Sequence, residues 1–231
     1  MDVEGVSIVA RGITATGPEG IVFENVDARI YPGELAVVVG EGGTGRTSLL
    51  LALSGRLRVL AGRIEFDEAP RRARHVRRSV VPARLRPGFE LEGRLRVAET
   101  IRERRLTTRV SARAVEEALA LVGADVDRDA LIDELYPDDK LLLAIALAAA
   151  GEPPGMLVDD VDLGLLPSGR SRVWSALRTL ADTGMTVLAS ATEHPSEADV
   201  QIKLPYNIVD FGDDTTGLPL FSTPLAREDT R

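Results

Sequence analysis

One glycine-rich stretch limits the folds open to this chain more than any other part of its sequence. Residues 40–47 (GEGGTGRT) have the G-x-x-x-x-G-K-[ST] spacing of a phosphate-binding loop, with Arg46 at the lysine position. The apolar run 35–39 before them predicts a buried strand, and residues 48–53 after them predict the first turns of a helix. In that context the glycines let successive N–H groups point at a phosphate. The stretch predicts a nucleotide site; the alternative is a glycine-rich turn that matches by chance.

The expected ligands of this loop are phosphate oxygens and a magnesium ion. The helix N-terminus adds a positive field at the phosphates, and the hydroxyl of Thr47 would bind Mg²⁺. The residues expected to bind nucleotide are Gly40, Glu41, Gly42, Gly43, Thr44, Gly45, Arg46, Thr47 and Ser48.

Composition narrows the class of protein. The chain has 231 residues, enough for a large buried interior, and no cysteine, which excludes disulfides and thiolate metal sites. We find no signal peptide and no apolar run of about 18 residues, so we do not expect the chain to cross a membrane. The longest apolar stretch, residues 141–151, predicts a buried helix instead.

Charge is unevenly distributed along the chain. The net charge is −8, yet between Arg71 and Arg113 fourteen arginines stand against four glutamates. This stretch is a candidate docking surface for an acidic partner, and the alternative is a solvated face in a protein with a general arginine bias. The chain as a whole has a negative net charge, and few aromatic residues lie between these arginines. Both features argue against nucleic acid as the partner.

Periodicity and turn residues predict an alternation of strands and helices. Strands are expected at 6–10, 21–23, 35–39, 63–66, 79–82, 156–160, 186–191 and 200–204, with residues 16–20 as a loop. Helices are expected at 48–53, 97–105, 111–122, 138–150 and 171–181, with Ser111 as an N-cap and Gly123 as a terminator.

Several short motifs, taken in this order, resemble one known family. Residues 31–35 (YPGEL) match the segment that precedes the phosphate loop in this family. Residues 61–64 (AGRI) match a strand that follows the family's first helix, and residues 95–101 (LRVAETI) match part of its helical subdomain. Residues 144–153 (AIALAAAGEP) match the helix before its Walker B strand, which places Asp159 at the Walker B aspartate. The sequence therefore resembles the nucleotide-binding domains of ATP-binding cassette (ABC) systems.

The resemblance implies an α/β fold, with an ABC-type P-loop NTPase core of mixed β-sheet and a helical subdomain. It places the core at 1–84 and 155–221 and the helical subdomain at 85–154, while the turn-rich end of the sequence predicts a mobile tail at 222–231. It implies ATP and Mg²⁺ as ligands, with Thr47 and Asp159 at the metal and Asp160 at the catalytic position. It also implies a cytoplasmic protein at the inner face of the cell membrane, with a membrane permease or another ABC subunit as partner.

The residues at the catalytic positions depart from the family pattern. Arg46 replaces lysine, and Asp160 replaces the catalytic glutamate with a side chain one methylene shorter. Ala83 falls on the Q-loop glutamine and Glu193 on the switch histidine, unless a one-residue slip brings His194 there. Since positioning affects rate steeply, these changes predict retained binding but weak or lost hydrolysis.

The signature segment departs furthest, with 135–139 reading LYPDD where the family has LSGGQ. Pro137 removes an amide, and Asp138 and Asp139 place carboxylates where the family binds the γ-phosphate of the opposite subunit. Acids and proline do suit the first turn of a helix. We therefore expect no ATP-sandwich homodimer through this segment.

Two classes of function follow. One is an ATP-binding transporter subunit, fully active or weakly hydrolysing. The other is a non-hydrolysing structural or regulatory ABC-like subunit. A small-molecule kinase is a weaker third reading, because no segment resembles a lid or an acceptor site.

Overall fold

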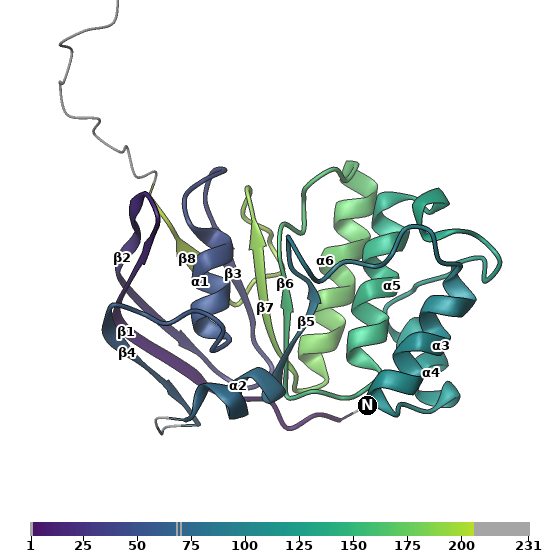
Figure 1. The fold of residues 1–231 in the computed structure, drawn as a ribbon, viewed down its shortest axis with the longest axis horizontal. Coiled ribbons are helices and arrows are strands. Elements are labelled where there is room, and N and C mark those ends of the chain that lie inside the picture. Colours follow the sequence, from purple (N-terminus) through teal and green to yellow (C-terminus); the bar gives the residue numbers. More distant parts are fainter. Residues whose placement is uncertain (1, 68, 70, 206–231) are drawn as a thin grey trace, which may run out of the picture.

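A computed structural model of the chain describes residues 2–67, 69 and 71–205. Figure 1 shows two sheets, with an antiparallel sheet at one end, a parallel sheet in the middle and a helical layer at the other end. The expected tail 222–231 lies outside the described residues, as does the part of the expected core from 206 to 221.

The strands are β1 (Ile8–Gly17), β2 (Gly20–Ile30), β3 (Leu35–Val39), β4 (Ala61–Phe66), β5 (Val80–Arg84), β6 (Gly155–Val158), β7 (Thr186–Ala191) and β8 (Val200–Lys203). The helices are α1 (Arg46–Leu53), α2 (Ala73–Ser79), α3 (Val97–Thr108), α4 (Ala112–Leu121), the 3-10 helix η1 (Ile132–Glu134), α5 (Pro137–Ala149) and α6 (Pro167–Asp182).

The parallel sheet has the strand order β5-β6-β7-β3-β8. Its apolar strands are buried on both faces, as parallel sheets require. In β3, Leu35 and Val37 pack with the core that includes α5 and α6, whereas Ala36 and Val38 pack with α1 and the antiparallel sheet. The two-residue alternation of a strand therefore divides the interior into two cores, one on each side of this sheet.

The antiparallel sheet has the order β2-β1-β4, and its strands are longer than the sequence predicted. Pairing of β1 with β2 continues to Gly17 and Gly20, which leaves a two-residue turn at Pro18 and Glu19. The expected loop 16–20 is therefore wrong, because cross-strand pairing extends into residues whose own composition favours a turn. The parallel and antiparallel strands form two sheets, and the expected α/β class is confirmed.

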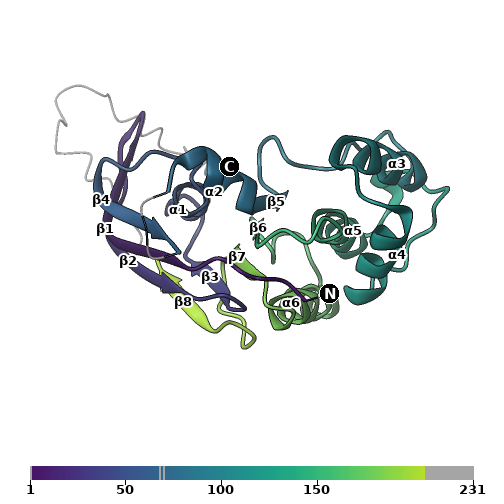
Figure 2. The same cartoon turned by 90° about the horizontal axis from the view of Figure 1, so that it is seen from below.

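The helical layer carries α3, α4, α5 and α6 (Figure 2). Every residue of α5 from Leu141 onward is buried, which confirms the buried helix predicted from its apolar run. The Oγ of Ser111 accepts a hydrogen bond from the N–H of Ala114 at 3.1 Å, so the predicted N-cap of α4 is also confirmed. Helices α3 to α5 fall within segment 85–154, although the domain boundaries themselves remain a prediction.

Helix α2 was not predicted, because its arginine-rich sequence has no apolar periodicity. Only Val76 is buried in it, and this side chain packs in the core that contains α1. Among the described residues, none of the helices has the length and apolar character needed to cross a membrane.

Candidate nucleotide-binding site

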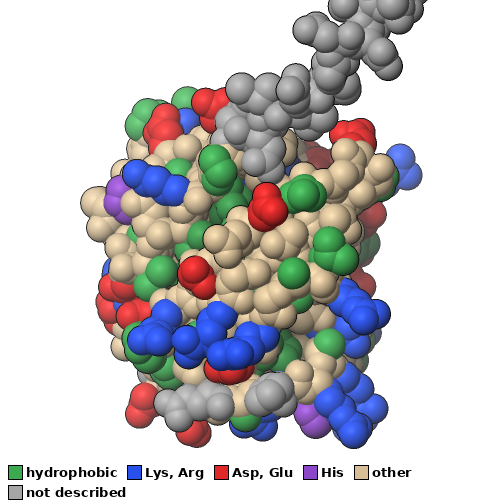
Figure 3. Space-filling view, turned by 90° about the vertical axis from the view of Figure 1, so that its left-hand side faces the viewer, with side chains coloured by type: hydrophobic (Ala, Val, Ile, Leu, Met, Phe, Trp, Pro, Cys, Tyr) green, Lys and Arg blue, Asp and Glu red, His purple; other side chains and the backbone are tan. Residues whose placement is uncertain are grey.

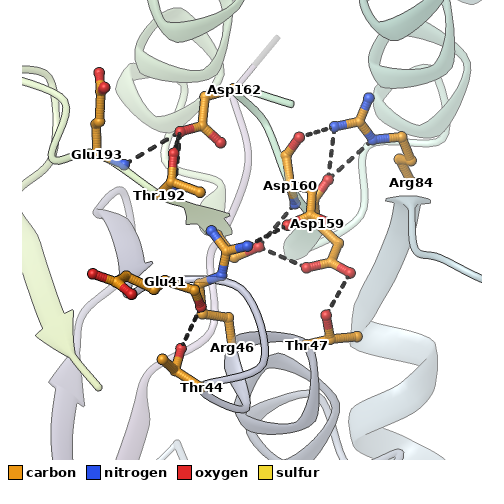
Figure 4. Close-up of polar contacts among 11 residues, drawn as sticks. Glu41, Thr44, Arg46, Thr47, Arg84, Asp159, Asp160, Asp162, Thr192 and Glu193 are labelled. Atoms are coloured by element: carbon orange, nitrogen blue, oxygen red, sulfur yellow. Dashed lines mark hydrogen bonds and ion pairs between the residues drawn. The ribbon is translucent and has the colours of Figure 1, made fainter. Parts of the chain in front are cut away.

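The ends of four parallel strands bring the predicted site residues together. Strand β3 leads into Gly40, β6 into Asp159, β5 ends at Arg84, and β7 leads into Thr192. Because the carboxyl ends of parallel strands meet at one edge of a sheet, segments far apart in the sequence become neighbours there. Figure 4 shows the polar contacts that result.

The glycine-rich loop has the backbone that a phosphate cradle needs. Gly43 and Gly45 have φ values of 83° and 90°, a region that favours glycine. A Cβ on Gly45 would lie 2.7 Å from Cγ1 of Val22, so this position also has no space for a side chain. The loop is braced internally, since Thr44 Oγ1 donates to the carbonyl of Glu41 at 2.9 Å. Helix α1 begins directly afterwards, at Arg46.

Thr47 and Asp159 lie where the resemblance places a magnesium ion. Thr47 Oγ1 donates to Asp159 Oδ2 at 2.9 Å, and Ser190 Oγ donates to Asp159 Oδ1 at 2.6 Å. Asp159 is fully buried. A hydroxyl and a fixed carboxylate side by side are hard oxygen donors that fit Mg²⁺, which Thr47 would hold directly and Asp159 through water. Ser190, a buried serine in an apolar strand, was not predicted to take part.

Arg46 and Asp160 form an ion pair across the mouth of the loop. Arg46 Nη2 lies 2.9 Å from Asp160 Oδ1, and the two side chains are 10% and 19% exposed. Arg46 Nη1 is buried without a hydrogen-bond partner among the described residues, which leaves one donor free for a phosphate oxygen. Asp160, which the resemblance places at the catalytic position, is therefore paired with Arg46, the side chain that would contact the phosphates.

Asp160 has an unusual backbone conformation, and its surroundings disfavour the charged form of its carboxylate. Its backbone has φ 50°, and its N–H donates to Ser190 Oγ at 2.8 Å. Burial raises the pKa of Asp160, as does the charge of Asp159, although Arg46 and Arg84 act in the opposite direction. The charged form of Asp160 is therefore less favourable here than in water.

Arg84 is a site residue that sequence reasoning missed, since it was counted only within the basic stretch from Arg71. Its Nε and Nη2 donate to the carbonyl of Asp159 at 3.0 and 2.8 Å, and Nη2 also donates to the carbonyl of Asp160. The residue is 9% exposed, and burial lowers its pKa to about 10. Arg84 therefore cannot belong to a docking surface; only its place directly after Ala83 could have indicated a role at this site.

The segment after β7 decides how Glu193 is oriented. Asp162 Oδ2 accepts hydrogen bonds from Thr192 N–H at 2.8 Å, from the Thr192 hydroxyl, and from Glu193 N–H at 3.2 Å. The Glu193 carboxylate pairs with Arg170 at 3.1 Å, and Figure 4 shows it pointing away from Arg46. The Glu193 carboxylate is therefore directed toward Arg170 and not toward Arg46. His194 is exposed in the same segment.

The start of α5 also differs from expectation. Pro137 is in the first turn, as predicted, but Asp138 and Asp139 both bind Arg172 of α6. Arg172 Nη2 lies 2.9 Å from Asp139 Oδ1. Their charge is largely neutralised within the chain, which the sequence could not show because Arg172 is 33 residues away from Asp139.

Ala83, at the position where the resemblance implies a glutamine, cannot bind a metal. It is 6% exposed and offers only a methyl group, so it supplies no ligand. Phe23 is 2% exposed and lies in the core, so its ring has no free face on which an adenine could stack.

Comparison with known proteins identifies relatives of most of this chain. Relatives include a ribose import ATP-binding protein of Burkholderia cenocepacia, 30% identical over 77% of this chain and 37% of its own length. A Nod factor export ATP-binding protein of Burkholderia pseudomallei is 31% identical over 78% of this chain and 60% of its own length. The chain thus spans between about a third and three-fifths of these relatives.

Solved structures show the same fold. A putative ABC transporter ATP-binding protein from Pyrococcus furiosus superposes with a TM-score of 0.73 at 20% identity, covering 86% of this chain and 97% of its own. CbiO1 of Clostridium perfringens gives 0.73 at 21% identity, with coverages of 88% and 85%. The sequence model of the ABC transporter family matches residues 23–162, more than half of the chain. The chain therefore belongs to the ABC transporter family.

Proposed function

We propose that this chain is the ATP-binding subunit of an ABC-type transport system. It binds a nucleoside triphosphate with Mg²⁺ at residues 40–48 and works with a membrane permease supplied by another chain, at the cytoplasmic face of the membrane. The observation that carries this proposal is the loop itself: Gly43 and Gly45 open the backbone, and Thr47 meets Asp159 at 2.9 Å beside the start of α1.

Isothermal titration with ATP and ADP tests the binding. We expect binding at sub-millimolar nucleotide and loss of most of the affinity in Arg46→Ala. The exposed Arg58→Ala serves as a matched control, since it removes the same side chain away from the loop. Absence of heat at millimolar ATP and ADP would refute the proposal.

We further propose that hydrolysis is weak or lost. The carboxylate at the catalytic position is short and bound by Arg46, and Ala83 cannot orient a water molecule. Glu193, at the switch position, is turned toward Arg170. Since such residues act as a unit, their combined loss removes most of the rate. Turnover near the typical enzyme value of about 10 s⁻¹, measured with the permease present, would show a fully active ATPase instead.

A non-hydrolysing structural or regulatory subunit is the second candidate. The ion pair between Arg46 and Asp160 favours it, because the site satisfies its own charges without a nucleotide. Failure to bind any nucleotide, together with an intact complex with the permease, would select this function over the first.

We propose that the chain does not form an ATP-sandwich homodimer through its own signature segment. The reason is the chemistry of this helix start: Pro137 has no N–H, and the side chains of Asp138 and Asp139, which pair with Arg172, accept hydrogen bonds but cannot donate one to a phosphate. Replacing residues 136–139 with Ser-Gly-Gly-Gln should raise ATP-dependent dimerisation in light scattering. An unmodified chain that already dimerises with ATP, and is unaffected by this replacement, would contradict the proposal.

The basic stretch from Arg71 to Arg113 remains a proposed docking surface for an acidic partner, restricted to its exposed members on α2 and α3. Figure 3 shows that Lys and Arg side chains also gather at the end of the molecule formed by the antiparallel sheet. In the antiparallel sheet Arg11 is the register partner of Arg63 across β1 and β4, although like charges in that relation are unfavourable. Changing Arg77 and Arg78 to Glu should abolish co-purification with the permease in moderate salt; unchanged co-purification would indicate a merely solvated face.

A further inference from the structure

The guanidinium of Arg84 is buried against the backbone that carries both site carboxylates. It reaches the carbonyls of Asp159 and Asp160 from the end of the neighbouring strand, β5. Its place directly follows Ala83, where the resemblance implies a metal ligand and this chain has none. The positive charge of Arg84 therefore lies next to Ala83, the position at which this chain lacks a metal ligand.

The two arginines at this edge offset part of its negative charge. Arg46 and Arg84 lie beside Asp159 and Asp160, and a third buried carboxylate, Asp162, accepts its hydrogen bonds from Thr192 and Glu193. Without Arg84 the edge would carry a larger excess of negative charge, which attracts a divalent cation and repels a triphosphate. Magnesium at a phosphate site relieves that repulsion by supplying positive charge. Arg84 supplies part of the same charge permanently.

A purely structural role does not account for an arginine here. The two carbonyls need only N–H donors, which a neutral glutamine amide also offers. Burying a charged group is costly, and burial lowers the pKa of Arg84 to about 10, while the charges of Asp160 and Asp159 support its protonated form. The buried positive charge is the property that a neutral donor would lack.

We propose that Arg84 acts as a built-in cation that makes nucleoside triphosphate binding at residues 40–48 only weakly dependent on Mg²⁺. It is a positioning residue, since it acts on the ligand through the two aspartates and does not touch the phosphates itself. The inference rests on the proposed nucleotide binding. Removal of one unit charge close to the phosphates, with screening by solvent, changes the affinity for a charged group by on the order of tenfold.

The test is ATP binding with excess Mg²⁺ and with EDTA, measured by isothermal titration for four proteins. For the unmodified chain we expect the two dissociation constants to differ by less than about tenfold. Arg84→Gln keeps an amide donor but removes the charge, and should increase this ratio by about tenfold. Arg84→Lys keeps the charge and should restore the original ratio. Arg113→Gln removes an exposed arginine of α4 that pairs with Glu117, and should leave the ratio unchanged.

Distinct results separate this inference from the proposed function. A ratio above about a hundredfold in the unmodified chain would overturn the inference while nucleotide binding stands, and this measurement needs no variant to fold. An equal ratio in Arg84→Gln and the unmodified chain would overturn it as well. Absence of ATP binding under both conditions would overturn the proposed function and the inference together.

Discussion

Replacing Asp160 with asparagine should strengthen nucleotide binding. Arg46 Nη2 donates a hydrogen bond to Asp160 Oδ1 at 2.9 Å, so a phosphate must compete with a carboxylate for this donor. Asparagine keeps the shape of the side chain, tolerates the φ of 50° that this residue adopts, and carries no charge. The change therefore removes the competitor and also one negative charge facing the triphosphate.

The size of the effect follows from the burial of the pair. At 2.9 Å and an effective dielectric of about 20, the Coulomb attraction is at most about 6 kcal/mol, of which desolvation removes the larger part. Hydrogen bonds to charged groups contribute about 1.5–3 kcal/mol net. The lower figure corresponds to roughly tenfold tighter binding, which we expect for ADP as well as ATP.

The fold should tolerate this substitution. The pKa of Asp160 is raised by burial and by Asp159, so between its ordinary and its raised value the folded chain holds a proton that the unfolded chain has lost. Stability therefore falls as pH rises through that window, and the charged carboxylate disfavours folding above it. Asp160→Asn should remove this pH dependence, with stability at neutral pH equal to or above that of the unmodified chain in urea denaturation.

The assay is titration of ADP into both proteins, because ADP affinity does not depend on turnover or on a second subunit. Glu193→Gln is the matched control, since it removes a carboxylate that pairs with Arg170 and not with the loop. We expect the control to bind ADP like the unmodified chain. Equal or weaker ADP binding by Asp160→Asn would show that the carboxylate does not compete with phosphate.

Further predictions concern the supports of the site. Gly45→Ala should destabilise the chain by more than about 1 kcal/mol and abolish ATP binding, because a Cβ there has no space and φ is 90°. Gly42→Ala, whose Cβ would meet nothing within 4 Å, should leave thermal stability unchanged, and equal losses in both would refute the steric argument. Ser190→Ala removes the 2.6 Å hydrogen bond to buried Asp159 and should lower the free energy of unfolding by about 1–3 kcal/mol in urea; no change would mean that water replaces the hydroxyl. Arg172→Ala should lower stability by about 1 kcal/mol or less at low salt, with a smaller effect at high salt, because the pair is partly exposed. A salt-independent loss would indicate packing instead of charge.

Local sequence determined most of the elements and the position of the loop. The bounds predicted for β3 and β7 agree with the structure, because a short apolar run between turn residues has few alternatives to a buried strand. The glycines of residues 40–47 also needed no tertiary information, since their backbone freedom belongs to the residue itself. The family, the α/β class and the pairing of Thr47 with Asp159 at one edge could be anticipated on this basis.

Only the tertiary structure determined which polar and charged side chains contact one another. The site contacts of Arg84 and Ser190, the pairing of Arg172 with the start of α5, and the turn of Glu193 toward Arg170 all join segments 23 to 75 residues apart. Hydrogen bonds and ion pairs depend on distances of about 3 Å, and side-chain types along a chain carry no information about such distances. For this reason the sequence indicated a degenerate nucleotide site, while the arrangement of strands showed that Arg46 and Arg84 lie against Asp159 and Asp160 there.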